Sequence, residues 1–101
     1  MVYNNNMKVN IDQIKQKVVP ILKEAGVKRS SLFGSVVRGE AGKNSDIDIL
    51  VEFPEGKTLL DLVRLEKKLE SALNKKVDLL TFNSIHPLLK DYIRKDQLQI
   101  L

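Results

Sequence analysis

The stretch that decides the fold is residues 32–53, LFGSVVRGEAGKNSDIDILVEF. It joins two short apolar runs through a polar, glycine-containing connection. Gly34-Ser35 follows the first run directly, and Asp46 and Asp48 stand one residue apart where the second run begins. Short apolar runs bounded by glycine and polar residues are typical of buried strands. We therefore expect strands at about 28–33 and 47–53.

The connection between these strands predicts a turn at Gly34-Ser35, one or two helical turns as far as Arg38, and a loop over 39–45. Upstream, apolar residues at helical spacing predict a helix from about 11 to 25, capped by Asn10. Pro20 lies inside this pattern, so we expect a kink there or two short helices. Gly26 is the expected end of the helix.

Downstream, Thr58 and Asp61 form a plausible capping box at the start of a second amphipathic helix. Its apolar face is expected to hold Leu59, Leu62, Val63, Leu69 and Leu73. A third strand over 76–82 should follow, then a short helix over 88–94 that begins after Pro87, and an edge strand over 98–101. Helices that alternate with strands predict an α/β (α+β) fold with two layers, in which a small sheet of three to four strands packs against helices.

Length and composition place limits on this fold. A chain of 101 residues can build one core, so we expect a single domain over 10–101 after a flexible, polar leader over 1–9. The sequence has no apolar stretch long enough to cross a membrane. It has no cysteine, which excludes disulfides, thiolate metal sites and cysteine nucleophiles and fits a reducing cytoplasm.

The formal net charge of +4 is unevenly distributed. Residues 1–34 hold six basic and two acidic side chains, whereas acidic residues concentrate between 46 and 61. The basic part is explained by a solubilising surface, which is the preferred interpretation, or by a flank that attracts nucleotide phosphates or nucleic acid.

Asp46 and Asp48 are the first candidate functional residues. In a strand, side chains two positions apart point to the same face, about 6.6 Å apart along the chain. Two such carboxylates repel each other unless a cation lies between them, and hard oxygen ligands suit Mg²⁺ or Mn²⁺. A D-x-D pair is also common where a strand simply begins in water, so the pattern alone leaves both interpretations open.

A third carboxylate would favour the metal interpretation. Asp78 lies within a segment that otherwise reads as a buried strand, where an unpaired charge is unfavourable. If that strand lies beside 47–53, Asp78 could complete a cage with Asp46 and Asp48. Glu52 is the alternative, but it lies about 13 Å beyond Asp48 along the strand, so Asp78 is preferred.

Gly34 and Ser35 could bind phosphate, because glycine allows close backbone approach and the turn presents amides and a hydroxyl. They could equally be a turn glycine and a capping serine. Arg38 could contact a phosphate or lock the loop by pairing with an aspartate. Together, three carboxylates opposite a phosphate-binding turn are the parts of a nucleotidyl transfer site. His86, the only histidine, is next to Pro87 and is interpreted as structural, and Ser35 has no triad partners.

The strings GSVVRG and SDID, residues 34–39 and 45–48, resemble the G-S-x-x-R-G…S-D-x-D signature of minimal nucleotidyltransferases in the DNA polymerase β superfamily. The resemblance extends over nearly the whole chain and includes SDIDILVEF, LLDLVRLEKKLE, KKVDLLT and HPLLKDYI. One departure is Val36, at a position where a polar or basic residue is frequent in the family; it could alter nucleotide or acceptor contacts.

The resemblance implies a nucleotidyltransferase fold and an activity. Asp46, Asp48 and Asp78 would be catalytic metal ligands for one or two Mg²⁺, with Mn²⁺ as a substitute, and Gly34, Ser35 and Arg38 would bind the nucleotide. The reaction would move AMP from ATP onto a hydroxyl. Many such proteins resemble the antitoxin that modifies a tyrosine of a HEPN-domain ribonuclease toxin. We therefore expect ATP and a HEPN toxin as partners, without a membrane or a direct nucleic-acid partner.

Two other functions are compatible with the sequence. The chain could neutralise a partner by contact alone, with apolar residues such as Leu88, Leu89 and Ile93 as the binding surface, although these residues could equally pack in the core. It could also transfer a nucleotide to a small molecule or an RNA end. A chain of 101 residues offers no second domain to shape such an acceptor pocket, which favours an acceptor on a separate protein.

Overall fold

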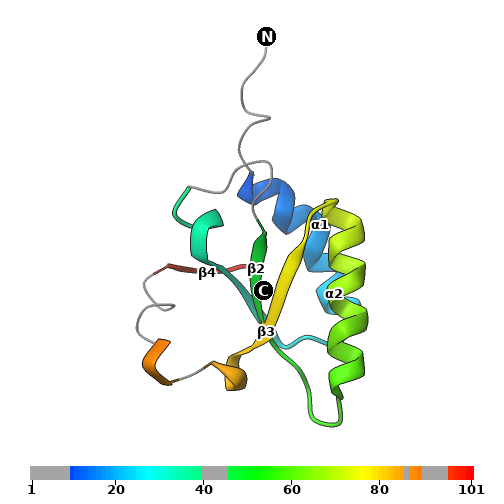
Figure 1. The fold of residues 1–101 in the computed structure, drawn as a ribbon. Coiled ribbons are helices and arrows are strands. Elements are labelled where there is room, and N and C mark those ends of the chain that lie inside the picture. Colours follow the sequence, from blue (N-terminus) through cyan, green and yellow to red (C-terminus); the bar gives the residue numbers. More distant parts are fainter. Residues whose placement is uncertain (1–9, 40–45, 86, 90–95) are drawn as a thin grey trace.

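The computed structural model describes residues 10–39, 46–85, 87–89 and 96–101. A four-stranded sheet has the order β3-β2-β1-β4 and consists of β1 (Arg29–Phe33), β2 (Ile47–Glu52), β3 (Val77–Thr81) and β4 (Gln97–Gln99). The strand β1 pairs antiparallel with β2 and with β4, whereas β2 and β3 are parallel. The helices α1 (Ile11–Glu24) and α2 (Leu59–Leu73) lie on the same side of the sheet (Figure 1). The expected two-layer α+β architecture is confirmed.

Helix α1 is a single helix despite Pro20. The expected alternative of two short helices is therefore wrong. Proline removes the hydrogen bond to the carbonyl four residues earlier, here that of Gln16. Both residues are exposed, so water can satisfy this carbonyl while the buried side of the helix packs on the sheet. The ends match the prediction, since the Asn10 side chain accepts from the Gln13 amide and Gly26 follows with φ +83.

The two faces of β2 have different roles. Ile47, Ile49 and Val51 are fully buried in the core beneath the helices. Because strand side chains alternate, Asp48, Leu50 and Glu52 lie on the opposite face, which neither helix covers (Figure 1). We call this the open face. Leu50 is fully buried there, so β2 is accessible on this face at Asp48 and Glu52 and not between them. The hydrophobic core is completed by residues of both helices and of β1 and β3, among them Val18, Leu22, Leu32, Leu65, Leu69, Val77 and Leu79.

Helix α2 begins with the predicted capping box. Thr58 Oγ1 accepts from the Asp61 amide at 3.4 Å, and Asp61 Oδ2 accepts from the Thr58 amide at 2.8 Å. The predicted apolar face needs correction at its start, because Leu59 is 74% exposed and Val63 is 40% exposed. The buried residues of α2 are Leu65, which the prediction omitted, and Leu69. Residues 59 and 63 belong to a neighbouring row of the helix surface that points away from the sheet.

After β3 the chain forms two short 3₁₀ segments, Phe82–Ser84 and Pro87–Leu89. The second begins at Pro87 as expected, but the rest of the helix predicted over 88–94 lies mostly outside the described residues, as do His86, Ile93 and the leader over 1–9. The last strand, β4, is an edge strand that begins one residue earlier than predicted. The described residues include no helix of the length and apolarity needed to cross a membrane.

Candidate active site

Asp48 and Asp78 lie side by side on the open face. The parallel pairing of β2 and β3 places Asp48 directly opposite Asp78, near enough for the charge of Asp78 to act on Asp48. Both residues come second in their strands, after the buried residues Ile47 and Val77. The alternation that buries those apolar neighbours therefore turns both carboxyl groups to the same open face. The strand adjacency on which the choice of Asp78 depended is present.

Gly34 forms the other side of the site. The register of β1 and β2 places Phe33 opposite Asp48, so the chain turns at Gly34 immediately beside this carboxylate. A Cβ at position 34 would lie 2.5 Å from Asp48 Oδ2, and Gly34 has φ +76. Only glycine combines this backbone conformation with such a close approach. Gly34, Ser35 and Val36 form a single 3₁₀ turn, shorter than the helical segment expected to reach Arg38, and Ser35 is half-buried in it.

The surroundings raise the pKa of Asp48 to about 6. Burial contributes most, because it disfavours the charged form. The nearby charges of Asp78 and Asp46 raise the pKa further, whereas the charge of Arg38 lowers it. A nearby cation would stabilise the ionised form of Asp48. Strongly shifted pKa values of this kind are enriched at cation-binding and catalytic positions.

Asp46 lies just before β2 and is half-buried, close enough for its charge to act on Asp48. Within the described part of the chain, no three acidic or histidine side chains lie near enough to one another to hold one metal ion. The register that places Asp48 beside Asp78 is present, whereas a shared role of these residues and Asp46 in binding a metal stays a prediction.

Arg38 pairs with an aspartate that the sequence interpretation did not consider. Its Nη1 donates to Asp96 Oδ2 at 2.9 Å, which ties the segment after the Gly34 turn to the residue that precedes β4. Both side chains are only about a third exposed or less, at 33% and 26%. Arg38 therefore holds the connection in place and still contributes positive charge to Asp48.

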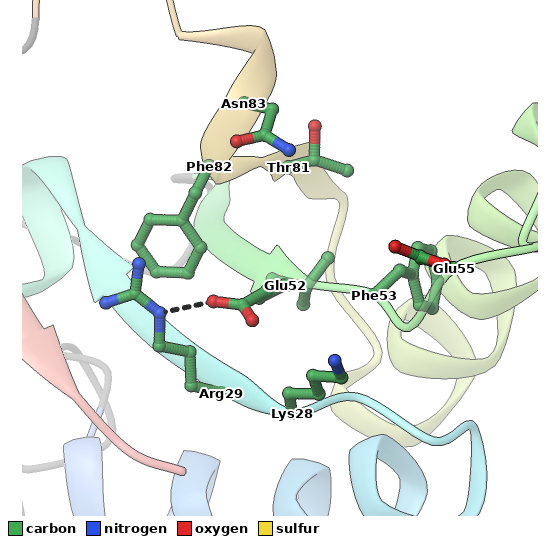
Figure 2. A pocket seen from close by; sticks show the side chains of 9 residues that line it. Lys28, Arg29, Glu52, Phe53, Glu55, Thr81, Phe82 and Asn83 are labelled. Carbon is green, nitrogen blue, oxygen red and sulfur yellow. Dashed lines mark hydrogen bonds and ion pairs between the residues drawn. The ribbon is translucent and has the colours of Figure 1, made fainter.

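Glu52, the rejected third ligand, has another partner at the far end of the open face. The Arg29 Nε donates to Glu52 Oε1 at 2.7 Å, and the guanidinium lies 4.1 Å from the centre of the Phe82 ring. Figure 2 shows these side chains around an open pocket of about 470 Å³, with Lys28 and Asn83 also on its wall. Glu52 is four positions beyond Asp48, so the pocket lies about 13 Å along the strand from the carboxylate pair.

Two glutamates of α2 contact the site indirectly, and the sequence interpretation did not consider them. Glu70 Oε2 accepts from the amide of Val77 at 3.0 Å, and Glu66 Oε2 accepts from the amide of Leu79 at 3.4 Å. These amides flank Asp78. The i, i+4 spacing of the glutamates was visible in the sequence, but it reads as an ordinary solvated helix face.

Comparison with known proteins agrees with this geometry. The family described as nucleotidyltransferase domain matches residues 11–99. A protein of Methanocaldococcus jannaschii, provisionally named a protein adenylyltransferase, is 60% identical over 93 residues, which cover 92% of this chain and 100% of the relative. The chain therefore belongs to the nucleotidyltransferase domain family.

Solved structures show the same fold. A toxin–antitoxin structure with AMP-PNP superimposes with a TM-score of 0.76 at 29% identity, covering 86% of this chain and 72% of the other. A tri-AMPylated Shewanella oneidensis HEPN toxin in complex with an MNT antitoxin matches with a TM-score of 0.71 at 25% identity, covering 89% and 71%. The predicted resemblance to minimal nucleotidyltransferases and to antitoxins of this kind is confirmed.

Proposed function

We propose that this protein is a metal-dependent adenylyltransferase that moves AMP from ATP onto a hydroxyl of a partner protein. The acceptor is a tyrosine of a HEPN-domain ribonuclease toxin, and its modification makes the protein an antitoxin that acts in the cytoplasm. The observation that carries this proposal is the Asp48–Asp78 pair, which lies on an open sheet face directly against the backbone of Gly34. The relatives named as adenylyltransferases and the toxin–antitoxin structures support it.

The residues present fit a hard divalent cation. Asp48 and Asp78 supply adjacent oxygen ligands, the type that Mg²⁺ and Mn²⁺ prefer. The raised pKa of Asp48 reflects burial first, and then the negative charges of Asp78 and Asp46. Asp46 is proposed as a further ligand. When bound, one or two such ions would lower the pKa of the attacking hydroxyl and neutralise charge on the triphosphate.

The chain's own residues position the reactants. Gly34 lets the backbone turn directly beside the Asp48 carboxylate, where a side chain at position 34 would collide with it. The Ser35 hydroxyl and the turn amides can donate to phosphate oxygens that approach this turn. Arg38 adds positive charge on the same side. The acceptor oxygen would bond to the α-phosphorus while the bond from that phosphorus to the bridging oxygen breaks. Pyrophosphate leaves with that electron pair, and the hydroxyl proton passes to solvent.

The test is transfer of label from α-labelled ATP. With Mg²⁺ and a HEPN-domain protein as candidate acceptor, the wild-type protein should label that acceptor on tyrosine. Asp48→Asn should reduce labelling by at least a hundredfold, because it removes an ionisable ligand from the centre of the site. Asp12→Asn, an equivalent change at an exposed position on α1, should leave the rate unchanged.

One observation favours a second candidate, neutralisation by contact. Leu59, Leu60 and Val63 expose apolar surface on the first turns of α2, at 74%, 56% and 40%, and Leu88 is 85% exposed. Such residues are available for a partner to cover. If the wild type leaves the partner unlabelled yet silences it in a stable complex, and Asp48→Asn silences it equally well, the enzymatic proposal fails and the binding function replaces it.

A further inference from the structure

We propose that Glu66 and Glu70 of α2 are positioning residues for Asp78, holding its strand at the distance from β2 that the site requires. The inference rests on the proposed function, since it treats Asp78 as part of the metal site. Neither glutamate reaches the open face; they would act through the backbone of β3.

The strand β3 lies at the edge of the sheet. A strand at the edge of a sheet has a neighbour on one side only, so its outer amides have no strand to pair with. Here the carboxylates of Glu70 and Glu66 accept from the outer amides of Val77 and Leu79. Short hydrogen bonds that involve a charged partner are about twice as strong as neutral ones. The bond from Val77, at 3.0 Å, is the stronger of the two, and the bond from Leu79, at 3.4 Å, is long and weaker. The outer edge is thus attached to α2 as its inner edge is attached to β2.

The spacing of the two glutamates along α2 matches the spacing of the two amides along β3. Residues four apart on a helix are separated by about 6.0 Å along its axis, and residues two apart on a strand by about 6.6 Å. The order is reversed, with the later glutamate on the earlier amide, as expected for a helix that runs antiparallel to the strand it precedes. Figure 1 shows α2 beside β3. Both bonds can therefore form together, one on each side of Asp78.

The strand β3 is also subject to electrostatic repulsion from β2 at Asp78. Asp78 faces Asp48 directly across the β2–β3 pairing, so two side chains of like charge lie opposite each other on neighbouring strands. Repulsion between the two carboxylates pushes the edge strand away from β2 whenever both are ionised. Attachment of Val77 and Leu79 to α2 opposes twisting or fraying at the position where that force acts.

The test uses Glu66→Ala/Glu70→Ala, the matching Glu66→Gln/Glu70→Gln, and Glu24→Ala as a control at an exposed glutamate of α1. Three quantities are measured on full-length protein: amide exchange of Val77 and Leu79 by NMR, Mn²⁺ affinity with a non-hydrolysable ATP analogue, and transfer kinetics. The alanine pair should speed exchange at both amides and weaken Mn²⁺ binding by about tenfold, the lower end of effects seen for groups that orient metal ligands. The kcat should fall by a similar factor, whereas KM for ATP should change less than about threefold.

The glutamine pair separates positioning from charge and from general stability. Glutamine keeps an acceptor oxygen, so Mn²⁺ affinity and kcat should return to within about threefold of wild type. Three results would each overturn the inference. The alanine pair could bind Mn²⁺ with unchanged affinity, the glutamine pair could be as impaired as the alanine pair, or the wild type could bind no Mn²⁺. If the wild type transfers no AMP, the proposed function fails on its own, while the exchange and Mn²⁺ measurements still decide this one.

Discussion

At the scale of single residues, the chemistry is concentrated in Asp48. Its pKa in the folded protein is about 6, against 3.8 for an ordinary aspartate, so the folded state binds a proton more tightly than the unfolded chain between these values. The stability that protonated Asp48 contributes is fully present below pH 3.8 and is lost as the pH rises through about 6. Metal-free protein should therefore be sensitive to pH at this one position.

The pKa of Asp48 can be tested by comparing the melting temperatures of the wild type and Asp48→Asn as a function of pH. Because Asp48→Asn cannot ionise, its melting temperature should rise relative to that of the wild type, by on the order of 5 °C, as the pH increases from 4 to 7.5. Calorimetry on metal-free samples measures this, and the subtraction removes the opposite trend of groups such as Asp61, whose pKa is lowered by hydrogen bonds from Thr58. Curves that stay parallel over this range would contradict the assignment.

At the scale of elements, α1 shows a local preference overridden by packing. Pro20 is unfavourable inside a helix by about 3 kcal/mol relative to alanine, partly offset by up to about 1 kcal/mol from the stiffer unfolded chain. The helix continues because Val18 and Leu22, on either side of Pro20, are fully buried against the sheet. Pro20→Ala should therefore raise the free energy of unfolding by about 1–2 kcal/mol, measured in urea. Lys17→Ala, an exposed change one turn earlier, should alter it by less than about 0.5 kcal/mol, and a loss of stability in Pro20→Ala would show that the helix depends on the proline.

At the scale of the whole molecule, the division into a helical face and an open face sets how an acceptor can approach. A stable protein interface covers roughly 800 Å² on each partner. A patch of that area centred on Asp48 and Asp78 extends far enough along the strands to include the pocket about 13 Å away. Arg29, held there by Glu52 and Phe82, is oriented for contact.

Arg29→Ala should therefore raise KM for the acceptor protein by about fivefold or more, without a comparable change in KM for ATP. Arg64→Ala, at an exposed position on α2, is the matched control and should leave both constants unchanged. Steady-state labelling with varied acceptor and varied ATP separates the two constants. Equal effects of both arginine variants would place the acceptor elsewhere.

Much of this organisation follows from local sequence patterns. The alternation of Ile47, Asp48 and Ile49 predicts which face carries the carboxylate, and Thr58 with Asp61 predicts the start of α2. The partners of Arg38 and Glu52, which are Asp96 and Arg29, could not be predicted. Each partner lies far away in the sequence, and the sequence offers many other pairs of opposite charge. The hydrogen bonds of Glu66 and Glu70 could not be predicted either. Charged residues at helical spacing indicate a solvent-exposed helix face, and the pattern does not show that the edge of a strand lies beside it.

The arrangement of β2, α2 and β3 also has a consequence for how the protein gains its activity. Asp48 and Asp78 are thirty positions apart in the chain and meet only through the parallel pairing that α2 connects. A chain whose synthesis has not yet reached β3 contains Asp48 but lacks Asp78, so its site is incomplete. A chain cut between β2 and α2 would leave one carboxylate on each fragment. Recovery of activity on mixing such fragments would report directly on their association. The same geometry thus makes the protein a natural starting point for a split reporter.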